Sequence, residues 1–417
     1  MSTQQYSVGC TTRRRWFFFA LLPLLLCATG HADEQKLEPS TPGLFFGEGL
    51  AVSDGSLFVG STQGFSPVST NGSSGYVDIY VRQPSGWSYT STLTAFDLGP
   101  LLPNGSDAFG NAIAVEGDWL AIAGQVSFSN INSVYLFHRV NSAWTQFQRI
   151  DKAFANNSTF GEALALHSGH LLVGAMDFDT KGDPQNGHVF AYELAGDTFV
   201  PLGELGRPLS ALGDNFGQSL AFVGDRLVTS APYFTDETGK RGLVFTYVFN
   251  FGQWASLSLL QPDNSSALSF GYKLASCLGG QQLAVAAPNV FGSAGVQVGY
   301  IETFQPSETG WQVAVAQIQP TDSSVPASYA SAIACDGSVL AAVAPGSNLG
   351  YQFIYLQNTW QQSASYSSAD PSNDRFSGPI AVASRDVVIS DTFQGTPTPL
   401  GAVYAFNSDI IFANGFE

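Results

Sequence analysis

The sequence of 417 residues is poor in charged residues, which make up 12% of it, well below the usual proportion. Its 33 acidic residues outnumber its 16 basic ones, so the formal net charge is −17. A chain this negative would be repelled by nucleic acid, which argues against nucleic-acid binding. The strong helix formers lysine and glutamate are scarce while glycine is abundant, at 44 residues, so a helical bundle is not expected.

The sequence also lacks the short motifs of common enzymes. It contains no Gly-x-Ser-x-Gly, His-Glu-x-x-His, glycine-rich phosphate loop or Cys-x-x-Cys, and only five histidines. We therefore expect no enzymatic activity and no cofactor. Because Asp and Glu side chains could still pair in space as in a glycosidase, an extracellular propeller hydrolase acting on a polysaccharide or other polymer remains an alternative.

Only one long apolar run is present, and it lies near the N-terminus. Arg13–Arg15 precede an apolar segment at 16–27, which is too short for a membrane-spanning helix of about 20 residues. Gly30-His31-Ala32 offers a small-x-small cleavage site, so residues 1–32 are interpreted as a secretory signal peptide. We expect an exported bacterial protein, either secreted, periplasmic or associated with the cell surface, without a stable transmembrane segment.

A Phe-Gly phrase recurs seven times after residue 32, at intervals of about 55 residues. An apolar residue follows four positions after each Phe, and then come a tight turn and a second apolar segment. The clearest copies are FGEGLAVSDGSLFVGS from Phe46, FGNAIAVEGDWLAIAG from Phe109, FGEALALHSGHLLVGA from Phe160, FGQSLAFVGDRLVTSAP from Phe216 and FGYKLASCLGGQQLAVAAP from Phe270. Two decayed copies begin at Tyr329 and Phe376.

Each unit is predicted to form four antiparallel strands, which we name A to D. A two-residue turn such as Asp54-Gly55 suits the hairpin between strands A and B. Strand C follows a glycine such as Gly401, and strand D has an early aromatic residue such as Trp87. Seven such units predict an all-β fold, a seven-bladed β-propeller over residues 33–408.

The two ends of this region complement each other. The last unit stops after its strand C at 401–406, without a strand D that contains Trp. The mature N-terminal segment, 33–38, precedes the first Phe-Gly, at the place where a strand D would end. We therefore predict that this segment supplies strand D of the last blade and closes the ring, so that neither edge stays unpaired.

These repeats resemble the FG-GAP repeats of integrin-α-like β-propellers in their short bacterial form, over about residues 33–406. The resemblance implies a propeller whose strand A is innermost, and a class of proteins that recognise ligands in adhesion. Calcium-binding members carry an Asp-rich loop between strands A and B, where this sequence has tight turns such as Gly224-Asp225. The calcium ligands of the family are therefore not expected here.

Binding residues are expected on the rim that holds the long B–C connections and the D–A connections, because loops on a rigid scaffold commonly carry recognition. The candidates on this rim are Phe178, Asp179, Lys181, Tyr233, Phe234, Asp236, Glu237 and Arg241. The expected partner is an extracellular protein or glycan, and a purely structural surface scaffold is a further alternative. Carboxylates beside a deep pocket at the channel mouth would favour the hydrolase, whereas exposed aromatic side chains on a shallow rim would favour binding.

No metal site is expected. The weak candidate is a B–C loop with Asp177, Asp179 and Asp183, whose alternating oxygens suit a hard cation, but Lys181 stands where a third carboxylate is needed. A solvated polar loop is the simpler interpretation. The segment 409–417 lies beyond the last blade as a C-terminal tail, which is either a sorting signal or an edge strand or frayed end.

Two cysteines remain after removal of the signal peptide, Cys277 and Cys335. Both fall in strand A, in two successive units, and an exported protein folds where disulfides form. Neighbouring inner strands bring the two residues close to each other, but their side chains alternate in direction along the strand. The sequence therefore leaves open a disulfide or two separate buried thiols.

Overall fold

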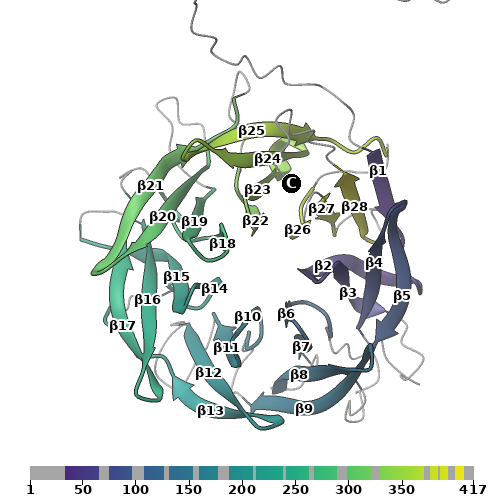
Figure 1. The fold of residues 1–417 in the computed structure, drawn as a ribbon, viewed down its shortest axis with the longest axis horizontal. Helices are drawn as coiled ribbons and strands as arrows, with labels where there is room; N and C mark the ends of the chain where they lie inside the picture. Colours follow the sequence, from purple (N-terminus) through teal and green to yellow (C-terminus); the bar gives the residue numbers. More distant parts are fainter. Residues whose placement is uncertain are drawn as a thin grey trace, which may run out of the picture. The chain divides into compact units, whose positions relative to one another are not determined.

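The computed structural model describes residues 33–64, 75–95, 108–125, 131–153, 159–176, 187–209, 213–237, 241–262, 267–288, 298–321, 326, 328–370, 376–383, 386–392 and 400–407. These residues form seven four-stranded antiparallel sheets arranged in a ring (Figure 1). The protein is an all-β, seven-bladed β-propeller, which confirms the fold predicted from the repeat. No helix in this part of the chain is long and apolar enough to cross a membrane. The predicted signal peptide and the C-terminal tail lie outside the described residues.

In the first six blades, the strands follow one another in sequence from the channel outward. The first three blades consist of β2 (Gly43–Ser53), β3 (Ser56–Gly64), β4 (Tyr76–Gln83) and β5 (Gly86–Leu93); β6 (Ile113–Glu116), β7 (Trp119–Gln125), β8 (Ile131–Val140) and β9 (Ala143–Ala153); and β10 (Ala163–His167), β11 (His170–Ala175), β12 (His188–Ala195) and β13 (Thr198–Glu204). The next three consist of β14 (Leu220–Val223), β15 (Arg226–Thr235), β16 (Arg241–Asn250) and β17 (Gln253–Leu260); β18 (Leu274–Cys277), β19 (Gln282–Ala287), β20 (Tyr300–Ser307) and β21 (Gly310–Ile318); and β22 (Ala332–Asp336), β23 (Val339–Ala344), β24 (Leu349–Leu356) and β25 (Thr359–Tyr366).

The seventh blade joins the two ends of the described chain. Its three inner strands are β26 (Ile380–Ala383), β27 (Asp386–Asp391) and β28 (Ala402–Asn407), and its outer strand is β1 (Asp33–Leu37). β1 pairs antiparallel with β28, with Asp33 opposite Asn407 and Leu37 opposite Val403. This pairing confirms that the N-terminal segment closes the ring.

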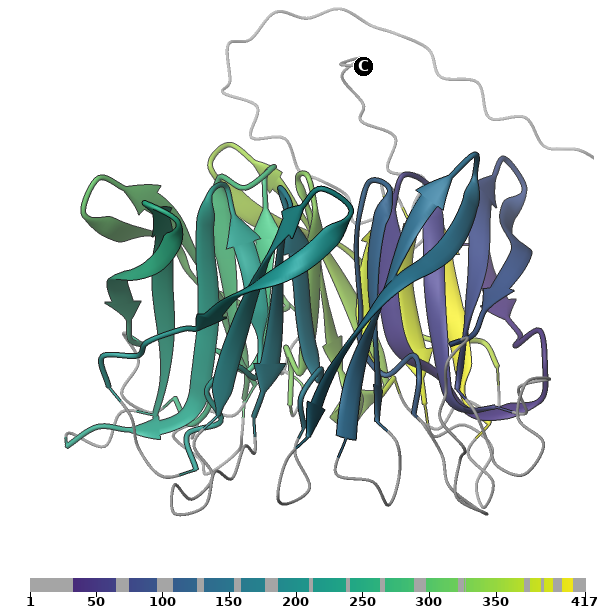
Figure 2. The same ribbon diagram turned by 90° about the horizontal axis from the view of Figure 1, so that it is seen from below.

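Strand A of every blade is innermost, so β2, β6, β10, β14, β18, β22 and β26 surround the central channel (Figure 1). The A–B and C–D turns lie on the upper side in Figure 2. We call this side the turn face. The strand ends at which the B–C and D–A connections begin lie on the opposite side, which we call the loop face. It includes the end of β15 and the start of β16.

The Phe-Gly phrase forms the junction between neighbouring blades. Phe46 is completely buried. Gly47 has φ +95°, and a Cβ there would lie 2.7 Å from Cβ of Ser390 and 2.8 Å from Cγ2 of Val403 in the seventh blade. A Cβ on the strand C glycine Gly401 would in turn lie 2.2 Å from the carbonyl oxygen of Phe46. Both glycines of the repeat are therefore needed where one blade meets the next.

The aromatic residues at the start of strand D pack between blades. Trp87 is buried, as is Trp360. The indole Nε1 of Trp360 donates to Oε1 of Gln282 in the preceding blade at 3.2 Å, and that of Trp311 donates to Oγ1 of Thr246 at 2.7 Å. These tryptophans therefore belong to the scaffold.

A disulfide joins Cys277 on β18 to Cys335 on β22, with their Cα atoms 5.2 Å apart. Of the two arrangements that the sequence left open, the structure has the bonded one. Cys277 is completely buried, and Cys335 is partly exposed. The bond links the innermost strands of the fifth and sixth blades at the channel wall.

Candidate functional site

A pocket of about 590 Å³ opens where the central channel meets the loop face, and we call it the channel mouth. All seven blades contribute to it through the segment that follows the Phe-Gly phrase or its equivalent. The second residue after each Phe or its equivalent forms a ring around the opening: Glu48, Asn111, Glu162, Gln218, Tyr272, Ser331 and Gly378. Six of these seven residues have polar side chains, which present two carboxylates, two amides, a phenol and a hydroxyl group.

The fourth residue after each Phe or its equivalent forms a second ring in the same pocket. Its members are all aliphatic: Leu50, Ile113, Leu164, Leu220, Leu274, Ile333 and Ile380. Because residues two apart in a strand project to the same side, the polar and aliphatic rings lie along the same wall. The channel mouth therefore combines a polar ring with an apolar one.

The third residue after each Phe or its equivalent is small in six of the blades and a lysine in the fifth. The series is Gly49, Ala112, Ala163, Ser219, Lys273, Ala332 and Pro379. Since six blades form without a long side chain here, the fold does not require Lys273. Among the residues that the structure describes, none forms a hydrogen bond or an ion pair with its amine. Burial lowers the pKa of Lys273, and the nearby charge of Glu162 opposes this.

Two residues of the polar ring, Glu48 and Asn111, also have polar groups in unusual surroundings. The channel wall desolvates the carboxyl group of Glu48 and raises its pKa, although a hydrogen bond from Oγ1 of Thr62 acts in the opposite direction. The side-chain oxygen of Asn111 is buried, and no group in the described part of the chain donates to it. A buried acceptor without a donor is rare in folded proteins, and a ligand hydroxyl or N–H would satisfy it.

Four of the rim candidates lie among the described residues with their side chains at least partly exposed. The phenol of Tyr233 is 44% exposed, and Glu237 and Arg241 are exposed while Asp236 is partly exposed. Burial raises the pKa of Tyr233, and the phenol of Tyr272 in the channel mouth raises it further. The candidates Asp177, Phe178, Asp179, Lys181 and Asp183 lie outside the described residues.

The prediction that Phe234 lies on the rim is wrong. The long B–C connection expected around Phe234 is shorter, because β15 and β16 continue until Thr235 pairs with Arg241. Side chains alternate along β15, so Tyr233 points outward while Phe234 is only 8% exposed. Phe234 packs in a core cluster with Phe216 and Leu243.

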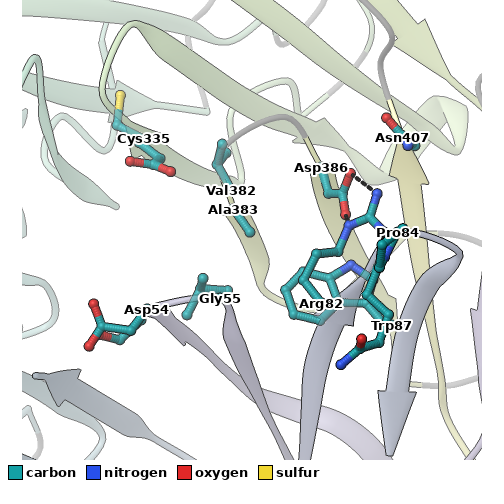
Figure 3. Close-up of a pocket in the computed structure, with 14 residues that line it drawn as sticks. Asp54, Gly55, Arg82, Pro84, Trp87, Cys335, Val382, Ala383, Asp386 and Asn407 are labelled. Carbon is teal, nitrogen blue, oxygen red and sulfur yellow. Dashed lines mark hydrogen bonds and ion pairs between the residues drawn. The ribbon is translucent and has the colours of Figure 1, made fainter. Parts of the chain in front are cut away.

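A larger pocket, of about 780 Å³, lies on the turn face between the seventh and first blades (Figure 3). Nε of Arg82 lies 2.5 Å from Oδ2 of Asp386, and its Nη2 lies 3.3 Å from Oδ1. Burial raises the pKa of Asp386, and the guanidinium of Arg82 offsets part of this effect. Because this guanidinium already pairs with a buried carboxylate, it joins the first and last blades and is not an open binding group. Among the described residues, no three His, Cys, Asp or Glu side chains are grouped to hold a metal ion.

Sequence reasoning missed Glu48, Glu162 and Lys273 as site residues. The signal was present in the aligned repeats, since Lys273 interrupts a series of small residues next to a constant aliphatic position. The ring closure then brings together positions that are about 55 residues apart in the sequence.

Neither a comparison with models of known protein families nor one with curated proteins finds a match. Among solved structures, the chain is similar to hydrazine synthase of Kuenenia stuttgartiensis, with a TM-score of 0.57 and 11% identity over 91% of this chain and 100% of that one. It is also similar to U3-55K, with a TM-score of 0.53 and 10% identity over 91% of this chain and 100% of that one. A periplasmic gluconolactonase of Pseudomonas aeruginosa aligns with a TM-score of 0.46 and 15% identity over 76% of this chain and 84% of that one. These likenesses concern the fold alone, because one propeller scaffold hosts many unrelated functions.

Proposed function

We propose that the protein is an exported binding module of the FG-GAP type that recognises a glycan through its loop face. The observation that carries the proposal is the channel mouth, where the polar ring stands over the aliphatic one. Carboxylate and amide groups can accept from and donate to neighbouring hydroxyl groups, while the aliphatic ring accepts the C–H face of a sugar. The exposed Tyr233 extends this surface onto the rim.

Two further observations support export and the FG-GAP type. The N-terminal segment 1–32 has the basic, apolar and small-residue regions of a signal peptide. The disulfide between Cys277 and Cys335 is typical of proteins that fold in an oxidising compartment. The order of Phe-Gly, strand C glycine and strand D tryptophan supports the resemblance to FG-GAP repeats.

A hydrolase is the second candidate, and one observation favours it. Glu48 and Glu162 share the channel mouth, and burial raises the pKa of Glu48. A carboxyl group with a raised pKa can act as a general acid while a second carboxylate acts as base or nucleophile. Release of reducing ends from a panel of polysaccharides, abolished by Glu48→Gln, would establish this activity in place of simple binding.

The binding proposal is tested with a glycan array probed with the mature protein, followed by calorimetry on the glycans that bind. We expect Glu48→Gln and Asn111→Ala to weaken binding about tenfold, the effect of losing one or two hydrogen bonds. Asp197→Asn serves as the control, because Asp197 is exposed in a C–D turn on the turn face. Two results would contradict the proposal. One is that no glycan on the array binds the mature protein, and the other is that both channel-mouth variants keep the wild-type glycan affinity.

A further inference from the structure

Lys273 differs in its surroundings from the other lysines that the structure describes. The amine of Lys36 pairs with Asp370 at 2.9 Å and Glu38 at 3.2 Å. The amine of Lys152 lies 4.0 Å from the centre of the Phe190 ring. Of these three, only Lys273 has no hydrogen bond, ion pair or aromatic partner for its amine among the described residues, and it lines a pocket of about 590 Å³. The sequence contains only two further lysines, Lys181 and Lys240, which lie outside the described residues.

The position of Lys273 in the repeat makes an ordinary packing role a poor explanation. Ala occupies the equivalent position in three blades, and Gly, Ser or Pro occupies it in the others. A long cationic side chain loses rotamer freedom and hydration when the channel wall surrounds it, and no described carboxylate forms an ion pair that offsets this cost. Lys273 is costly to bury, is not needed for the fold and lines a pocket. It is therefore a candidate for a reactive residue.

We propose that Lys273 is a reactive amine that captures a small hydroxy-aldehyde in the channel mouth as an imine. The lone pair of Nζ attacks the carbonyl carbon as the C=O π bond breaks, and one proton passes from the nitrogen to the oxygen to give a carbinolamine. The C–O bond then breaks as the C=N bond forms, and the hydroxyl group leaves with the second proton of the nitrogen as water. The overall change is the union of an aldehyde and an amine to an imine and one water molecule, so it needs neither oxidant nor reductant.

The surroundings of Lys273 suit each step of this reaction. Attack requires the neutral amine, and burial lowers the pKa of Lys273 in spite of the charge of Glu162. The dehydration step requires a proton donor and acceptor, and the carboxyl groups of Glu162 and Glu48 line the same pocket. The polar ring offers partners for hydroxyl groups next to the aldehyde. This inference does not rest on glycan recognition, because amine chemistry and reversible binding use different properties of the channel mouth.

The test uses the mature protein with glycolaldehyde as the probe and cyanoborohydride to reduce any imine to a stable amine. Tryptic peptide mapping by mass spectrometry then gives the rate of labelling at each lysine. We expect Lys273 to be labelled several-fold faster than Lys36 and Lys152 near neutral pH. Labelling of Lys273 at the same rate as these two, or more slowly, would overturn the proposal.

Two variants separate the amine chemistry from folding and from charge. Lys273→Ala places at this position the residue found in three other blades, so its melting temperature should stay close to that of the wild type. Lys273→Arg keeps the positive charge and removes the nucleophilic amine, so the label on that peptide should disappear in both variants. Continued fast labelling of another lysine in these variants would overturn the assignment to Lys273.

Discussion

The side chain of Gln35 forms two hydrogen bonds with the backbone of Trp87. Its Nε2 donates to the carbonyl oxygen of Trp87 at 2.7 Å, and its Oε1 accepts from the N–H of Trp87 at 2.7 Å. Gln148 on β9 makes the same pair of bonds with Phe199 on β13, at 2.9 and 2.8 Å. The closing strand β1 therefore contacts the next blade in the way that a strand D within the continuous chain does.

The first prediction concerns this closure. Gln35→Ala should lower the free energy of unfolding by about 1–3 kcal/mol, because two hydrogen bonds are lost and the backbone groups of Trp87 lose their partners. Deletion of β1, Asp33–Leu37, should have a larger effect, since it leaves the edge of β28 unpaired and open to other chains. Thermal unfolding and light scattering on the mature protein measure both effects.

Gln148→Ala is the matched control for Gln35→Ala, because it removes the equivalent pair of bonds from two blades that the chain connects directly. Its destabilisation should be similar to that of Gln35→Ala. A chain without β1 that melts like the full mature protein would show that the N-terminal strand is not needed for a closed ring.

The repeated junctions were predictable from the sequence because each leaves a local residue signature. Phe46 fills the junction of two blades, and Gly47 and Gly401 stand where a Cβ would collide with the neighbouring blade. The missing strand D of the last unit likewise indicated the role of β1. The channel mouth was not predicted, because Glu48, Glu162 and Lys273 meet only through the curvature of the ring. The extent of β15 was also missed, since turn-like residues near Asp236 resemble a longer loop.

The second prediction tests the contact between strand C glycines and the next blade. A Cβ on Gly187 would lie 1.8 Å from the carbonyl oxygen of Phe216, and its φ lies outside the left-handed region. Gly117 has φ +56° in a turn with no atom within 4 Å of its Cβ position. We expect Gly187→Ala to cost about 3 kcal/mol or more through the clash, and Gly117→Ala about 1 kcal/mol through φ alone. Urea unfolding measures the free energy of unfolding of both variants. Equal losses of stability would mean that neighbouring blades move apart at no cost in free energy.

The third prediction concerns Asp78 on β4, whose carboxyl group is completely buried. It accepts hydrogen bonds from the N–H of Ser40 at 2.8 Å, from Oγ of Ser40 at 2.7 Å and from Oγ1 of Thr92 at 2.6 Å. Burial raises the pKa of Asp78 in spite of these bonds. The folded protein therefore holds this proton more tightly than the unfolded chain, so stability from this group is largest below about pH 3.9 and is lost as pH rises through the raised pKa.

Comparison with Asp78→Asn isolates this effect, because the amide has the same shape and does not titrate. The stability of the wild type relative to Asp78→Asn should decrease as pH rises from about 4. Melting temperatures measured across this range give the difference directly. The exposed-site variant Asp197→Asn, measured over the same range, controls for the general effect of pH on the melting temperature. A wild type that gains stability over Asp78→Asn as pH rises would mean that the pKa of Asp78 is lowered by folding.

The fourth prediction concerns the disulfide between Cys277 and Cys335, which are 58 residues apart in the sequence. Closing a loop of this length restricts the unfolded chain, so breaking the bond should cost about 4 kcal/mol. Mature wild-type protein, unfolded without reductant, should show no free thiol and should melt at a lower temperature once reductant is added. The double variant Cys277→Ala/Cys335→Ala should melt near the reduced wild type and should not respond to reductant, because the innermost strands β18 and β22 remain packed but are no longer linked. Two free thiols in the unreduced wild type, or the same melting temperature with and without reductant, would show that packing alone holds the fifth and sixth blades together at the channel.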